Sequence, residues 1–198
     1  GELIGVIAHE TGHISGGHLT RLPERLRAAM LKSVAAMLLG AAAGIAGGGP
    51  DAGIGVALGG QQMAMRGLLS FTRGMEQAAD QSALAELDAN HWSARGLLTL
   101  FHTLQQQDAL NADMQDPYLR THPLTRDRVA FVEHHLATSP YADAPFPPGF
   151  ESGFAMVRAK LQAFLAPGAA TLRRIPESDH SAPARYARSI AQLRLGHT

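Results

Sequence analysis

The sequence has no cysteine among its 198 residues. This absence excludes disulfide bonds, thiolate ligands for a metal ion and a cysteine nucleophile. It does not indicate a cellular compartment, because proteins of oxidising compartments also occur without disulfides. Thiol catalysis and thiolate zinc sites are therefore outside the functions that this chain can have.

An excess of either charge is also absent. The 17 Lys and Arg residues balance 17 Asp and Glu residues, which gives a net charge of 0 at pH 7. Proteins that bind nucleic acid usually carry a basic patch or an excess of basic residues. The composition therefore predicts no nucleic-acid partner, and the length is sufficient for one sizeable hydrophobic core.

A short motif near the start of the sequence, His9-Glu10-Thr11-Gly12-His13, is typical of a metal site. Apolar residues recur at helical spacing from Leu3 to Ile14, which predicts an amphipathic helix. Residues four apart lie on one face of a helix, so His9 and His13 can offer two nitrogens to one ion. Glu10 falls beside them, as in the His-Glu-x-x-His zinc peptidases, where this glutamate is the general base.

A catalytic zinc site of this type needs a third ligand. The long metzincin motif requires a histidine six residues after the second one, but Leu19 stands there and His18 comes one residue early. The other known solution is a carboxylate from a separate helix. Glu76 suits that role, and Asp80, one turn later, can accept a hydrogen bond from a ligand histidine and orient its ring.

Three segments together resemble a known family: His9 to Arg21, Glu76 to Asp80, and Thr121 to Arg128. They are similar to the gluzincin endopeptidases of the cell envelope. That family includes CAAX prenyl-protein endopeptidases, a heat-shock protease of the bacterial inner membrane, and periplasmic proteases that act on outer-membrane protein assembly. The resemblance covers about residues 1–135 and is greatest to the periplasmic members that carry tetratricopeptide repeats.

The resemblance implies a role for each motif residue. It implies Zn²⁺ bound by His9, His13 and Glu76, with Glu10 activating water and Asp80 orienting a ligand.

The same resemblance places His122 and Arg128 at the edge of the zinc site. Two roles are open for His122. It can stabilise the oxyanion of the tetrahedral intermediate, or it can occupy the fourth zinc position and hold the enzyme inactive, because catalytic zinc needs that position free for water. Arg128 is a candidate for stabilising negative charge there.

The resemblance also implies the fold class, which is mainly α with a helical zincin-type core. In related peptidases a strand beside the zinc aligns the substrate, and this sequence offers no segment for it. We expect a fragment that lacks its N-terminal part, including any signal sequence, and that has weak peptidase activity or none by itself.

A helical hairpin is predicted after the metal motif. We expect Pro23, within Arg21–Glu24, to mark the end of the first helix. From Ser33 to Met65 the only charged residue is Asp51, and Val34–Ala46 is too short to cross a hydrocarbon core of ~30 Å. The simplest expectation is that this hairpin packs against the first helix. The alternatives are a mobile lid or a membrane-contacting surface.

The later elements are predicted from periodicity and from capping residues. They are a hairpin arm over Ile54–Leu69, a helix carrying Glu76 over Leu68–Leu87, a helix over Ala94–Gln107 capped by Ser93, a loop over Asp108–Arg120, and a helix from Thr121 to about Ala137 capped by Thr121.

The chain is expected to divide at a proline-rich linker. Residues 1–138 form the predicted peptidase domain and residues 139–149 the linker. Residues 150–198 form a helical segment with helices at Phe150–Leu165 and Ala184–Gly196 and an irregular stretch between them. This segment resembles the start of a tetratricopeptide region, although stacked repeats need more than one helix pair.

The function predicted from these features is a zinc endopeptidase that cleaves misfolded or misassembled proteins of the bacterial cell envelope. The expected location is the periplasm, with the inner membrane as alternative, and the envelope assembly machinery is a candidate partner. Two other functions stay open. One is a chaperone or scaffold module whose zinc is structural or autoinhibited. The other is a membrane-embedded peptidase with Ala28–Phe71 in lipid.

Overall fold

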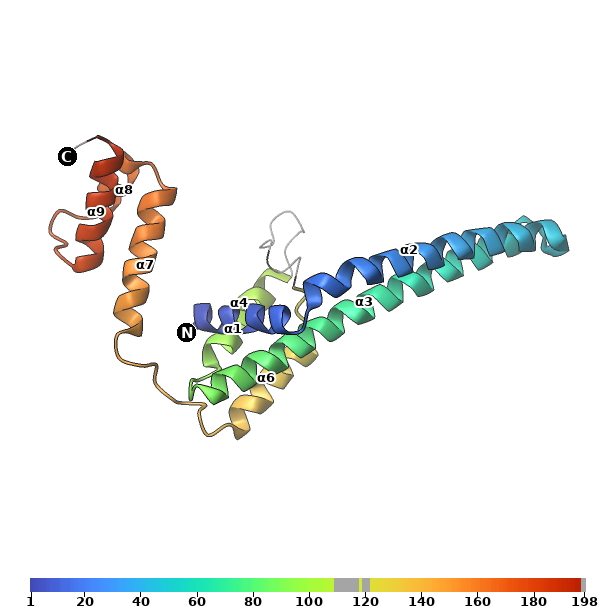
Figure 1. The fold of residues 1–198 in the computed structure, drawn as a ribbon, viewed down its shortest axis with the longest axis horizontal. Helices are drawn as coiled ribbons and strands as arrows, with labels where there is room; N and C mark the ends of the chain where they lie inside the picture. The colour runs from blue at the N-terminus through green and yellow to red at the C-terminus, as the bar shows by residue number, and fades with distance from the viewer. Residues whose placement is uncertain (109–117, 119–121, 197–198) are drawn as a thin grey trace. The chain divides into compact units, whose positions relative to one another are not determined.

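The computed structural model describes residues 1–108, 118 and 122–196, and these residues fall in two compact units, Gly1–Pro145 and Phe146–Thr198. All regular secondary structure of the described residues is helical (Figure 1). The predicted mainly α fold is therefore confirmed.

One hydrophobic core organises the first unit. Helices α1 (Glu2–Ser15), α4 (Arg95–Asp108) and α6 (Arg126–Thr138) pack with the C-terminal part of α3 (Gly49–Ala89). The core lies where these helices meet, because each contributes one apolar face. Its buried members are Ala8, Ala83, Leu84, Leu87, Ala94, Leu97, Phe101, Val129 and Val132.

The first helix ends earlier than the sequence predicts. It stops at Ser15, and Gly17 takes a left-handed conformation (φ 61°) before α2 (His18–Ala43) begins. The prediction that Arg21–Glu24 ends the first helix is wrong, because two successive glycines allow the break sooner. Pro23 instead lies inside α2, one turn past its start, where the helix lacks one backbone hydrogen bond.

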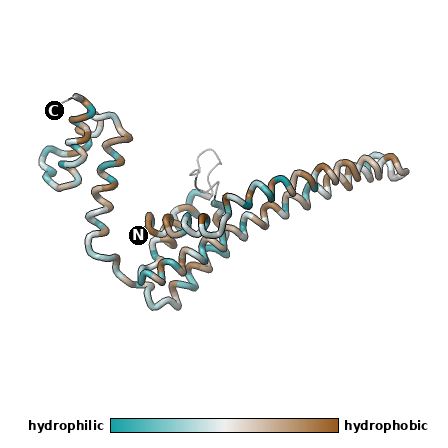
Figure 2. Tube along the Cα trace, viewed as in Figure 1, coloured by the Kyte–Doolittle hydropathy of each residue, from teal (hydrophilic) through white to brown (hydrophobic). Residues whose placement is uncertain are grey.

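The predicted hairpin is formed by α2 and α3, joined through a short π-helical turn, η1 (Gly44–Gly48). It extends beyond the other helices of the first unit (Figure 1), so packing against α1 is limited to its base. The arm predicted at Ile54–Leu69 and the helix predicted at Leu68–Leu87 are one helix, α3. The outer part of the hairpin is strongly apolar (Figure 2).

Glycine permits the close approach of α1 to its neighbours. A Cβ atom at Gly12 would lie 2.6 Å from the backbone oxygen of Ala79 in α3, and one at Gly5 would lie 2.9 Å from Leu97 in α4. Neither distance leaves room for a side chain. The backbone of α1 therefore rests directly on α3 next to the positions that carry Glu76 and Asp80.

Side-chain caps fix the starts of α4 and α6. Ser93 Oγ accepts a hydrogen bond from Arg95 N at 3.1 Å, as the sequence predicts. Helix α6 begins at Arg126 with Thr125 as its cap, so the prediction of a helix that starts at Thr121 is wrong. Most of the predicted loop Asp108–Arg120, and Thr121 itself, lie outside the described residues.

The second unit contains α7 (Phe150–Leu165), α8 (Gly168–Arg174) and α9 (Ala182–Arg194). Its small core consists of Ala159, Ala163, Ala187 and Ile190. Helix α8 lies in the stretch predicted to be irregular, which is a correction, because a seven-residue helix is too short to show periodicity.

The start of the proline-rich segment belongs to the first unit. Ser139 Oγ donates to Asp88 at 2.8 Å, and Arg95 Nε donates to Asp143 at 2.9 Å. The boundary between the two units falls at Pro145.

We expect Gly12→Ala to destabilise the first unit by about 1–3 kcal/mol, because the added methyl group would force α1 away from α3. Gly67→Ala is the matched control: a Cβ there meets nothing within 4 Å, and alanine should stabilise an exposed helix interior by about 0.5–1 kcal/mol. Urea unfolding measures both, and equal effects of the two substitutions would contradict the α1–α3 contact.

Candidate metal centre

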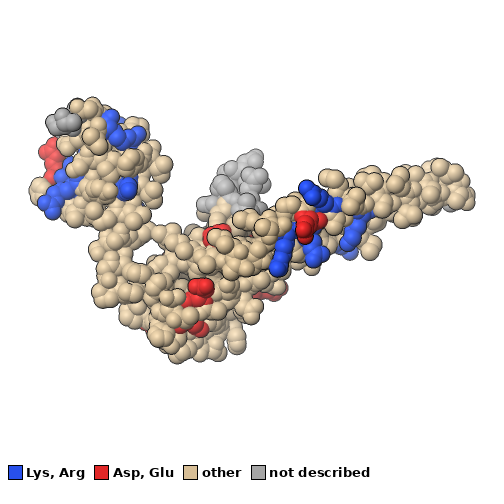
Figure 3. All heavy atoms as spheres, in the orientation of Figure 1, with Lys and Arg blue, Asp and Glu red and all other residues tan. Residues whose placement is uncertain are grey.

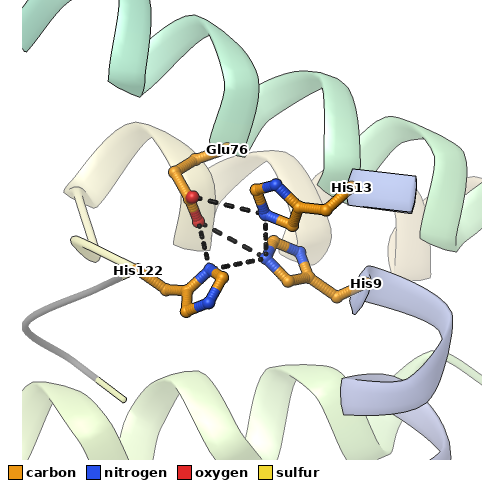
Figure 4. Close-up of side chains that lie close together, drawn as sticks. All are labelled: His9, His13, Glu76 and His122. Carbon is orange, nitrogen blue, oxygen red and sulfur yellow. Dashed lines mark hydrogen bonds and ion pairs between the residues drawn. The ribbon is translucent and has the colours of Figure 1, made fainter. Parts of the chain in front are cut away.

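Four side chains from three parts of the first unit converge on one point. They are His9 and His13 of α1, Glu76 of α3, and His122, which precedes α6 (Figure 4). One nitrogen or oxygen atom of each lies within 4.8 Å of the others. Among the described residues this is the group of histidine and acidic side chains that could hold a metal ion.

The distances between these atoms are of the size expected for ligands of one ion. His9 Nε2 lies 3.0 Å from His13 Nε2, 3.4 Å from His122 Nδ1 and 3.4 Å from Glu76 Oε2. Glu76 Oε1 lies 3.3 Å from His13 Nε2, and Glu76 Oε2 lies 3.3 Å from His122 Nδ1. Bonds of about 2.0–2.1 Å to a central ion give tetrahedral edges of about 3.3–3.4 Å. The donor set of three imidazoles and one carboxylate thus fits a small divalent ion.

A buried arginine holds the two carboxylates of this region. Arg128 Nε and Nη2 donate to Asp80 at 2.6 and 2.9 Å, and Arg128 Nη1 lies 2.9 Å from Glu76 Oε2. Asp80 Oδ1 in turn lies 2.8 Å from His9 Nδ1. Arg128 is 3% exposed and Asp80 is 0% exposed, so neither reaches solvent. The arrangement points His9 Nε2 toward the cluster, as such carboxylate partners of ligand histidines do.

The contacts in the cluster shift the pKa values of Glu76 and His9. Burial alone would raise the pKa of Glu76, but His122, His13, His9 and Arg128 outweigh it and lower that pKa. Burial alone would lower the pKa of His9, but Asp80 and Glu76 outweigh it and raise that pKa. Glu76 is therefore held as a carboxylate, and the site favours a cation.

Glu10 lies at the open side of the cluster. Its side chain is 42% exposed, whereas that of Glu76 is 3% exposed, and Glu10 Oε1 lies 3.5 Å from His122 Nε2. Glu10 is thus close to the site and partly exposed, although its Oε1 atom is buried.

Two residues near the site were not predicted from the sequence. The Tyr118 ring stacks on His122 with centroids 4.5 Å apart, and burial, followed by the charge of Glu10, raises the pKa of Tyr118. No local pattern marks Tyr118, because its segment has no periodicity. His18, which sequence reasoning excluded as a third ligand, packs edge-on against His13 with centroids 4.8 Å apart.

The Nδ1 atoms of His18 and His13 lie 2.9 Å apart. His18 is 7% exposed, and burial, followed by the charges of His13 and Arg21, lowers its pKa. A neutral His18 can accept the Nδ1–H of His13. That tautomer leaves the lone pair of His13 Nε2 directed at the cluster.

Comparisons with known proteins cover most of the first unit. The profile of peptidase family M48 matches residues 1–136. The chain is 32% identical over 133 residues to the beta-barrel assembly-enhancing protease of Escherichia coli strain K12, and 31% identical over 133 residues to that of Yersinia pestis. It is 32% identical over 131 residues to a Vibrio cholerae serotype O1 relative to which the same name is assigned provisionally.

Each of these matches covers 65% of this chain and 26% of the relative. The chain thus spans about a quarter of the length of the curated relatives that it matches. No solved structure matches the chain.

We expect His18→Ala to weaken metal binding by roughly 10–100-fold, the usual effect of removing the partner of a ligand histidine. His18→Gln, which retains a hydrogen-bond acceptor, should recover part of that loss. Competition with a chromogenic chelator measures the affinity, and His180→Ala, an exposed histidine of the second unit, is the control. Unchanged affinity in His18→Ala would show that the contact with His13 is incidental.

Proposed function

Because the chain belongs to peptidase family M48, we propose that it is a zinc-dependent endopeptidase whose ion is held by His9, His13 and Glu76. The observation that carries this proposal is the convergence of one nitrogen or oxygen atom from each of these three side chains and from His122 to within 4.8 Å of one another. A zinc ion held there would act as a Lewis acid and would lower the pKa of a bound water molecule.

Glu10 is the proposed general base. It takes a proton from the attacking water and passes it to the leaving amine of the cleaved peptide bond. Its position supports this role, since it follows the ligand His9 on α1 and is far more exposed than Glu76. A base must meet both the water and the substrate, whereas a ligand need only meet the ion.

Asp80 and Arg128 are proposed to position the ligands. Asp80 orients His9, and Arg128 binds Asp80 and Glu76 at once. Arg128 is 3% exposed, so contact with a substrate oxyanion, the role considered from the sequence, has less support than this one.

His122 is proposed to keep the enzyme inactive in this conformation. Its Nδ1 lies 3.4 Å from His9 Nε2 and 3.3 Å from Glu76 Oε2, which supports a role as a fourth ligand. Catalytic zinc sites leave that position to water or substrate. Withdrawal of His122 would then switch the peptidase on, and this geometry favours inhibition over stabilisation of an oxyanion.

The proposed substrates are misfolded or misassembled proteins of the bacterial cell envelope, and the proposed location is the periplasm. The names of the relatives support this proposal, since they describe proteases that enhance β-barrel assembly. The envelope assembly machinery is the proposed partner, and residues 150–198, as the start of a tetratricopeptide-like region, would bring proteins to the peptidase.

We expect His122→Ala to raise cleavage of an unfolded protein such as casein by roughly tenfold or more. The reason is that an inhibited enzyme has its competent state populated at only about 0.1–10%. The variant should bind zinc with the three remaining ligands. A fall in activity at equal zinc content would instead assign His122 to stabilising the oxyanion.

We expect Glu10→Gln, made in the His122→Ala background, to lower that cleavage by roughly 10²–10⁴-fold while zinc content stays the same. Glu2→Gln, on the same helix, is the control and should have no effect. A chelator should abolish cleavage in the control and zinc should restore it. Retained cleavage in the Glu10 variant would contradict the proposed general base and would favour the chaperone or scaffold alternative.

A further inference from the structure

The distal half of the α2–α3 hairpin exposes an apolar surface that the proposed peptidase chemistry does not use. From Ser33 to Met65 its only charged residue is Asp51. On the face shown in Figure 3 this half carries no charged side chain. Its large exposed apolar residues, each between 44% and 87% exposed, are Val34, Met37, Leu38, Leu39, Ile45, Ile54, Val56, Leu58, Met63 and Met65.

Small residues of the hairpin lie between α2 and α3, and its large apolar residues are exposed. A Cβ at Gly40 would lie 2.5 Å from the backbone oxygen of Gly53, and one at Gly60 would lie 2.2 Å from Ala36 Cβ. The two helices therefore meet backbone to backbone, which leaves no room for large apolar residues between them. Helices that pack in lipid use small residues at their contact in this way, because lipid can cover the large ones.

Basic side chains, named here the basic collar, lie between this apolar half and the base of the hairpin. The collar consists of exposed side chains from both helices and includes one acidic neighbour, Glu24 (Figure 3). Such residues beside an apolar segment bind anionic lipid headgroups. The collar is formed by Arg21, Arg25, Arg27, Lys32, Arg66 and Arg73.

The length of the uncharged part limits how deep it can reach. The range His18–Gly47 is long and apolar enough to cross a membrane by length and composition, and 11% of its most apolar window is buried. Its first half, however, carries four collar residues. From Lys32 to the turn at Gly44, α2 rises about 18 Å, and from Gly49 to Arg66, α3 rises about 26 Å, at ~1.5 Å per residue; both are shorter than the ~30 Å hydrocarbon core.

We propose that the α2–α3 hairpin inserts into one leaflet of a bilayer that contains anionic phospholipid, with Lys32 and Arg66, the collar residues next to the apolar half, in the headgroup layer. Glu76 follows Arg66 by about 15 Å along α3, at ~1.5 Å per residue, so the metal centre stays in water near the membrane surface. This anchoring does not depend on the metal or on peptidase activity, and it differs from insertion of the whole range Ala28–Phe71.

Lipid fits this surface better than a second protein chain does. Successive residues of a helix point about 100° apart, so Met37, Leu38 and Leu39 face three directions, and all are at least 51% exposed. A protein partner would cover one side of the hairpin, whereas lipid covers all of it. The collar adds charge complementarity to the same occupant.

Flotation with vesicles of equal parts phosphatidylglycerol and phosphatidylcholine tests the proposal. The wild-type chain should float with these vesicles. Leu38→Glu combined with Ile45→Glu should lower the partition coefficient by at least roughly tenfold, because two apolar side chains lose their burial. The matched control, Leu165→Glu combined with Leu193→Glu, alters equally exposed leucines of the second unit and should float as the wild type does.

Substitutions in the basic collar test its contribution to vesicle binding separately. Lys32→Ser and Arg66→Ser should each weaken binding to the anionic vesicles by roughly fivefold, since each basic residue near such a surface contributes about 1 kcal/mol. Binding to pure phosphatidylcholine should be weaker for the wild type and unchanged by these substitutions. Equal binding to both kinds of vesicle would overturn the role of the collar.

The absence of cysteine allows one site-specific probe of depth. A fluorophore on Ile45→Cys should be quenched by lipids that carry a quencher near the bilayer centre. The same thiol, left unlabelled, should not react with an impermeant reagent trapped inside the vesicles. Reaction there would show a spanning hairpin and overturn insertion into one leaflet.

Two further results would overturn the proposal. One is a wild-type chain that does not float with anionic vesicles. The other is a dimer in lipid-free buffer that the Leu38 and Ile45 substitutions dissociate while vesicle binding is absent, which would assign the apolar surface to a second copy.

Discussion

The arrangement of the site depends on one buried guanidinium group. Arg128 contacts both Asp80 and Glu76, and its charge offsets two carboxylates that could not otherwise be buried side by side. The same group lies over the Phe101 ring, 4.9 Å from its centroid, which ties the site to the hydrophobic core. Through this residue, α6 fixes the part of α3 that faces α1.

Binding of a metal ion at this site would be coupled to folding. The candidate ligands come from α1, from α3 and from His122 in the segment before α6, so the free energy of binding would stabilise the contacts between all three segments. The Nε2 atoms of His9 and His13 lie 3.0 Å apart, so one ion could bind both.

Local periodicity predicts the parts of the site that lie on single helices. The spacing of His9 and His13, and that of Glu76 and Asp80, needs only the geometry of a helix. Contacts between segments are harder to predict. The end of α1 is marked better by Gly16 and Gly17 than by Pro23. A proline near the start of a helix costs little stability, whereas a glycine in the left-handed conformation ends the preceding helix. His18 contacts His13, and Tyr118 contacts His122. Neither contact follows a helical or strand periodicity, so the sequence does not predict it.

The continuity of α3 has a mechanical consequence. A single helix runs from Gly49 at the turn of the hairpin past Glu76 and Asp80, with no break in its 41 residues. The part of α3 in the hairpin and the part that carries Glu76 therefore belong to one continuous helix. A tilt of its outer end would therefore be transmitted along the helix to the turns that carry Glu76 and Asp80.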